Sequence, residues 1–139
     1  METGMARTPR ISGAITDLMA GNERHAWTLE EMHADLARSG TATDFSSIFR
    51  AAEKLVADGA IRKVLLDDGR ARFELITAHH DHLLCTRCDA LVPVPCVIPR
   101  RTFAALEARN GIAITEHRVV LSGLCRNCRK ATRRRRSRA

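Results

Sequence analysis

Apolar residues recur at helical spacing in three successive segments of the first half of the chain, residues 10–20, 28–40 and 43–59. Apolar side chains one turn apart predict amphipathic helices, and a glycine stands at or just after the end of each segment. The second segment opens with Thr28 and has Glu31 three residues later, the pattern of a capping box. We therefore expect three short helices in succession.

Residues 60–75 change to alternating apolar and polar positions around Asp68-Gly69, a strong signal for a β-hairpin. Three short helices followed by a hairpin is the order of a winged helix-turn-helix, in which the third helix enters the DNA major groove. This pattern predicts a DNA-binding domain over residues 1–76. A small helical domain with an ordinary mixed surface is the alternative.

A second, smaller domain is expected over residues 77–130. Its pattern favours strands at residues 82–85, 90–95 and 116–125, with a helix at 99–111 between the last two. The apolar positions are too few for a self-sufficient core, so we expect support from a metal or from dimerisation. The predicted fold class is α+β, an N-terminal winged helix-turn-helix followed by a small α/β dimerisation domain with a structural zinc.

The net charge of +7 comes from the C-terminal end of the chain. The last eleven residues hold seven Lys/Arg and no acidic residue. The rest of the chain has 16 basic and 16 acidic residues and is therefore neutral. Residues 131–139 are therefore expected to be a disordered basic tail that adds phosphate contacts without sequence preference. Residues 1–75 carry 10 basic and 12 acidic groups. If this domain binds DNA, its basic groups must lie on one face and its acidic groups on the opposite face.

No apolar run is long enough to span a bilayer, so we expect a cytoplasmic protein that does not enter the membrane. In that compartment, cysteines are more often metal ligands or free thiols than disulfides. Two Cys-x-x-Cys pairs, Cys85/Cys88 and Cys125/Cys128, supply the four thiolates that a closed structural Zn²⁺ site requires. Cys96 has no such partner and is expected to be a buried thiol.

Three histidines and an aspartate precede the first cysteine pair, in the stretch "HHDH" at residues 79–82. Successive side chains of an extended segment point to opposite faces. His80 and His82 would then share one face, and His79 and Asp81 the other, so one strand can supply two sites with nitrogen and oxygen ligands. A histidine-rich surface loop is the alternative.

These motifs together resemble the ferric uptake regulator (Fur) family of metal-dependent repressors. The resemblance covers roughly residues 8–130 and rests on "FSSIFRAAEKLVADGAI", "FEL", "HHDH", "TEH" and "GLCRNC", in the same order and spacing. It implies a homodimer that binds a palindromic DNA operator when a second divalent cation, Zn²⁺, Fe²⁺ or Mn²⁺, occupies a sensory site.

The resemblance also implies site residues. The sensory metal would be held by His25, Glu74, His80 and His82. A further site would use His79, Asp81 and His117. Arg100 stands where the family has a glutamate, so this last site is expected to be incomplete unless Glu107 or Cys96 substitutes.

The winged-helix arrangement places DNA contacts on the third helix and the hairpin. Phe49 and Arg50 are the expected base contacts, Phe49 through thymine methyl groups. The expected phosphate contacts are Lys54, Arg10, Arg70 and Arg72.

Three other functions compete with that of a metal-responsive repressor. An enzyme of the zinc deaminase type needs an H-x-E motif, which the sequence lacks, and four thiolates leave no open metal position. A constitutive zinc-ribbon module would bind nucleic acid without sensing metal. A peroxide-sensing member of the family would favour aspartate at the position of Glu74.

Overall fold

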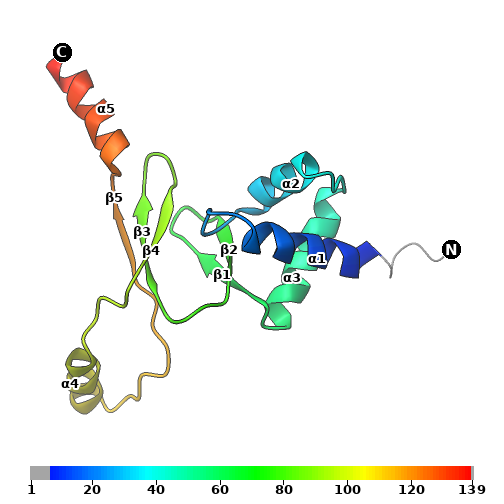
Figure 1. The fold of residues 1–139 in the computed structure, drawn as a ribbon. Coiled ribbons are helices and arrows are strands. Elements are labelled where there is room, and N and C mark those ends of the chain that lie inside the picture. Colours follow the sequence, from blue (N-terminus) through cyan, green and yellow to red (C-terminus); the bar gives the residue numbers. More distant parts are fainter. Residues whose placement is uncertain (1–6, 139) are drawn as a thin grey trace. The chain divides into compact units, whose positions relative to one another are not determined.

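The computed structural model describes residues 7–138, and the chain divides after Thr77 into two compact units. Residues 1–6 of the predicted first domain, and Ala139 of the predicted tail, lie outside the described residues. Figure 1 shows the order of the elements along the chain. Their bounds are α1 Arg7–Ala20, α2 Leu29–Arg38, α3 Phe45–Ala57, β1 Ile61–Leu65, β2 Ala71–Leu75, β3 Asp81–Cys85, β4 Leu91–Val94, α4 Arg100–Asn110, β5 Val120–Gly123 and α5 Arg126–Ser137.

The first unit is a winged helix-turn-helix, as the sequence predicted. Its three helices and the antiparallel β1–β2 hairpin enclose a single apolar core. Each helix contributes residues one turn apart, because only one stripe of an amphipathic helix can face the interior. The core residues are Ile11, Ile15, Met19, Trp27, Met32, Leu36, Ile48, Ala51, Ala52, Leu55, Ile61 and Phe73.

Local signals fix where these helices start. Thr28 accepts a hydrogen bond from the backbone N–H of Glu31, and the Glu31 carboxylate accepts one from the backbone N–H of Thr28. This is the predicted capping box. Asp44 caps α3 by accepting from the backbone N–H of Ser47 at 3.1 Å. A side-chain acceptor satisfies an N–H group that has no partner within the helix.

Trp27 joins the segment before α2 to the β1–β2 hairpin, which forms the wing of the winged helix. Its backbone N–H donates to the Phe73 carbonyl at 3.0 Å, and the Phe73 N–H donates back at 2.8 Å. Its indole N–H donates to the Asp35 carboxylate at 3.1 Å, while the ring is fully buried. This contact fixes the stretch around His25 beside β2.

The second unit contains a three-stranded sheet of order β4-β3-β5. The central strand β3 pairs antiparallel with β4 and parallel with β5. The predicted strand at residues 116–125 is shorter in the structure, since only Val120–Gly123 pairs with β3. The backbone N–H of Val119 donates instead to the Asp81 side chain, which ends the regular ladder there.

The basic C-terminal segment is helical, which corrects the prediction of a disordered tail from residue 131. Helix α5 continues to Ser137 and has no buried residue. Arginine favours helices and no glycine or proline interrupts the segment. Thr132 also donates to the Cys128 carbonyl and accepts from Arg87. Among the described residues, no helix is long and apolar enough to cross a membrane.

Candidate metal centres and nucleic-acid surface

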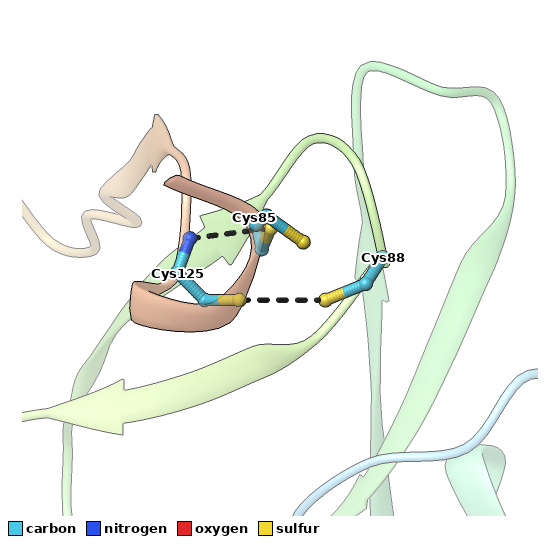
Figure 2. A group of neighbouring side chains, drawn as sticks. Cys85, Cys88 and Cys125 are labelled. Carbon is cyan, nitrogen blue, oxygen red and sulfur yellow. Dashed lines mark hydrogen bonds between the residues drawn. The ribbon is translucent and has the colours of Figure 1, made fainter. Parts of the chain in front are cut away.

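Four cysteines of the second unit converge at one point. Cys85 ends β3, Cys88 lies in the following turn, and Cys125 and Cys128 lie at the start of α5. Figure 2 shows Cys85, Cys88 and Cys125 together, and the Cys88 and Cys125 sulfurs are 3.9 Å apart. This separation is nearly twice a disulfide bond and close to the sulfur–sulfur edge of roughly 3.8 Å in a tetrahedral Zn²⁺ site. The four thiols therefore fit the predicted structural zinc.

The ionisation of these thiols also favours a cation. The backbone N–H of Cys125 donates to the Cys85 sulfur at 3.3 Å, and this contact contributes most to lowering the pKa of Cys85 to about 6. Contact with Cys125 raises the pKa of Cys128 to about 12. Negative charges on thiolates this close repel one another, which opposes their ionisation. A bound divalent cation neutralises that repulsion.

A second cluster in the same unit contains His79, Asp81, Cys96 and His117, whose ligand atoms all lie within 4.8 Å of one another. Asp81 is 1% exposed, and His79 and His117 place Nε2 at 3.7 and 3.8 Å from its Oδ1. The three residues expected from the sequence are therefore brought together.

Cys96 is not the buried thiol that the sequence predicted. It is exposed, and its sulfur lies 3.3 Å from His117 Nε2. Glu107, the other candidate substitute, accepts from the backbone N–H of Ile114 and so closes the turn after α4. The sequence could not show that Cys96 lies at this cluster. Cys96 and His117 are 21 residues apart in the chain and come together only in the tertiary structure.

Two of the four expected sensory ligands lie in the first unit. His25 Nε2 is 2.5 Å from Glu74 Oε2, and Arg62 lies 3.7 Å from the other carboxylate oxygen. Glu74 is on β2 and fully buried, so its charge needs these basic partners.

The other two expected sensory ligands lie in the second unit. The rings of His80 and His82 have centroids 4.7 Å apart, and His82 is buried on β3. The alternation predicted for "HHDH" is therefore confirmed within this unit. His80 and His82 form one pair, while His79 and Asp81 belong to the other cluster.

Helix α3 presents the side chains expected to contact DNA bases. Phe49 is 46% exposed although it is a large apolar residue, and Arg50 beside it is also exposed. The opposite side of the helix packs into the core through Ile48, Ala52 and Leu55. Lys54 is exposed as well and pairs with Asp58 at 2.7 Å. Arg10 is exposed on α1.

The wing departs from the prediction at Arg72. This arginine is 3% exposed and donates to Asp68 at 2.8 Å and to the Arg70 carbonyl at 3.0 Å. It orders the turn between β1 and β2 and does not present its charge at the surface. The Arg72 hydrogen bond lowers the pKa of the Asp68 carboxyl to about 2. Arg70 is half exposed and also lies 3.6 Å from the Asp68 carboxylate.

Comparison with known proteins agrees with this architecture. A ferric uptake regulation protein of Bordetella parapertussis is 28% identical over 128 residues, which cover 90% of this chain and 89% of that protein. A crystal structure of the Vibrio cholerae ferric uptake regulator has a TM-score of 0.74 at 22% identity, covering 83% of this chain and 88% of the other. A zinc uptake regulator complexed with zinc and DNA has a TM-score of 0.63 at 18% identity, and the match covers 88% of this chain and 83% of the other.

The sequence model of the ferric uptake regulator family matches residues 2–122, which is most of the chain. The whole winged helix lies within the matched residues, and so do Cys85 and Cys88 of the cysteine cluster. The chain belongs to the ferric uptake regulator family.

Proposed function

We propose that this chain is a metal-responsive transcriptional repressor that binds a palindromic operator as a homodimer. The effector would be a divalent cation, Fe²⁺, Zn²⁺ or Mn²⁺, held by His25, Glu74, His80 and His82. The zinc at the cysteine site would remain bound throughout and would serve the fold.

The observation that carries the proposal is the presence of one ligand pair in each unit. His25 and Glu74 already lie together in the first unit, and His80 and His82 already lie together in the second. Only five residues separate Glu74 from His80 in the chain. A cation that binds all four ligands would favour one orientation of the winged helix, and so would shift the population toward the DNA-binding state.

The second unit supports the homodimer. Leu83 pairs in register with Val92 on one side and with Leu121 on the other, which places the three side chains in a row across the sheet. All three are more than 40% exposed. A continuous apolar row on a sheet face favours association, since burial removes that surface from water. A two-fold dimer would present both α3 helices to successive major-groove half-sites.

The two exposed residues of α3 give the proposal its DNA contacts. The Arg50 guanidinium can donate two hydrogen bonds to guanine, and Phe49 can pack on a thymine methyl group. Lys54, Arg70 and Arg10 would contact phosphates. The relative solved in complex with zinc and DNA supports this reading of the fold.

The test is an anaerobic titration of protein that retains only the cysteine-site zinc. Fe²⁺, Zn²⁺ and Mn²⁺ are added separately, and affinity is measured for a duplex that the protein itself selects from a random library. We expect the effector to tighten binding roughly 5- to 150-fold, the range of typical allosteric coupling. The cation that acts at the lowest free concentration is the effector.

A double variant, His80→Ala with His82→Ala, should lose this response. His33→Ala is the matched control, because His33 is not a proposed ligand of any metal and contacts the Thr43 carbonyl. Retention of the metal response in the double variant would contradict the sensory site. Equal DNA affinity with and without every cation would instead support a constitutive module.

A further inference from the structure

We propose that the Cys96 thiolate completes the site of His79, Asp81 and His117, in place of the glutamate that Arg100 replaces, and that the completed site binds zinc. The proposal does not depend on operator binding or on the sensory site, since all four residues belong to the second unit. It assigns to Cys96 a role that its position between Pro95 and Val97 does not suggest.

The distances fit a tetrahedral ion. Zinc bonds of about 2.0–2.3 Å place neighbouring ligand atoms roughly 3.3–3.8 Å apart. The Cys96 sulfur is 3.3 Å from His117 Nε2, and Asp81 Oδ1 is 3.7 Å from His79 and 3.8 Å from His117. Three of the six ligand–ligand distances therefore already match edges of the required tetrahedron, and all of the ligand atoms lie within 4.8 Å of one another.

Asp81 also positions the segments that bring the other ligands. Its Oδ2 accepts from the backbone N–H of Val97, the residue after Cys96, at 3.0 Å. Its Oδ1 accepts from the backbone N–H of Val119, two residues after His117, at 3.3 Å. One buried carboxylate thus ties the loop after β4 and the loop before β5 to the start of β3. A set of ligands held this way loses less conformational freedom on binding a metal.

His117 has support of its own. Its ring lies 4.6 Å from the Phe103 ring of α4 and 4.2 Å from the His79 ring, measured between centroids. Contact with these two rings restricts the orientation of the imidazole, whose Nε2 lies near Cys96 and Asp81. Arg100, at the start of α4, is exposed and supplies no ligand atom.

The donor set selects the metal. Two imidazoles, one carboxylate and one thiolate are all good zinc ligands, and a thiolate suits Zn²⁺ better than Mn²⁺, which prefers oxygen. The cluster differs from the cysteine site in its donors, because it offers one thiolate where the cysteine site offers four. We therefore expect this zinc to exchange with solvent faster than the zinc held by four thiolates.

Alkylation of Cys96 tests the site in DNA-free protein. The full chain, with zinc in its cysteine site, is treated with iodoacetamide, and modification of the Cys96 peptide is followed by mass spectrometry. Two further equivalents of Zn²⁺, enough to fill the proposed sensory site as well, should slow the reaction at least about tenfold, since a metal-bound sulfur is a poorer nucleophile than a free thiolate. The same concentration of Mn²⁺ should leave the rate unchanged.

Variants separate a zinc site from general shielding. His79→Ala removes an exposed ligand, so at least about tenfold more zinc should be needed for the same protection. His33→Ala should behave as the unchanged chain, and Cys96→Ser should bind one zinc fewer per monomer. The proposal is overturned if zinc does not protect Cys96, if it protects equally in His79→Ala, or if Cys96→Ser keeps its full zinc content.

Discussion

At the residue scale, surroundings decide what a side chain does more than its type does. Arg70 and Arg72 lie two positions apart on the wing, yet Arg70 is half exposed and Arg72 is buried against Asp68. Cys85 joins a closed four-thiol site, while Cys96 faces imidazoles and a carboxylate. A role in DNA or metal binding therefore follows from the neighbours that tertiary structure gives a residue.

The Asp68–Arg72 pair gives a prediction for the wing. Asp68→Asn removes the negative acceptor for a buried guanidinium, so we expect the free energy of unfolding to fall by about 1–3 kcal/mol. The loss should be local, with weaker ordering of the turn at residues 66–70. Urea unfolding and amide chemical shifts of Arg70 and Arg72 measure the two effects.

Asp67→Asn is the matched control, because Asp67 is the exposed neighbour and its substitution should cost less than about 0.5 kcal/mol. The pH dependence follows from the lowered pKa of Asp68, about 2 against an ordinary value of 3.8. The stabilisation is present above the ordinary pKa and disappears as the pH falls toward 2, when the carboxylate is protonated. Equal stability of both variants near neutral pH would contradict the role of this pair.

At the element scale, the sheet of the second unit depends on the cysteine site more than on a core. Of its apolar strand residues, Leu84 is buried, whereas Leu83, Val92 and Leu121 are exposed. The β3–β5 pairing ends at Cys85 and Gly123, just before Cys125. A metal bound by both cysteine pairs closes the gap of 36 residues between them and fixes this pairing.

Loss of one cysteine ligand should therefore loosen the sheet. In Cys128→Ser, we expect amide hydrogen exchange in β3, β4 and β5 to become at least about tenfold faster. The winged helix should be unaffected, because its core is separate. Fluorescence of Trp27, the single tryptophan, reports that core.

Cys96→Ser is the control for this experiment, because it also removes a thiol but leaves all four cysteine-site ligands. Exchange in β5 should remain slow in that variant. Equal acceleration in both variants would mean that the cysteine site does not hold the sheet together more than the site at Cys96 does. A parallel change in Trp27 fluorescence would mean that the two units do not fold separately.

The helices, the wing and the four cysteines could all be predicted, because each depends on spacing within a short segment. The capping box at Thr28 and the Asp68-Gly69 turn are examples. The role of Cys96 could not, since it depends on two loops that Asp81 joins. Burial of Arg72 was missed because it depends on how the turn folds back on the strand. The prediction of a disordered tail used only the charge of residues 131–139. It did not consider that arginine favours helices, and most of this segment belongs to α5.

At the scale of the whole molecule, the charge is concentrated on α5. Seven of the 23 basic residues lie in the last eleven positions, and the remainder of the chain is neutral. All four arginines at residues 133–136 are exposed on this helix. Phosphate contacts made there would release counterions without reading sequence. In a DNA-bound dimer, α5 would then raise affinity for all duplexes, while α3 would select among them.

Substitution of Arg133, Arg134, Arg135 and Arg136 by glutamine tests this division of labour. Glutamine keeps a similar helix propensity, so circular dichroism should change little. The slope of log affinity against log salt concentration should decrease in magnitude by about 0.9 for each phosphate that the variant no longer neutralises, equally for selected and random duplexes. Lysine at the same four positions should preserve the slope, because the charge remains. An unchanged slope in the glutamine variant, or a weakening confined to the selected duplex, would show that α5 does not bind phosphates in general.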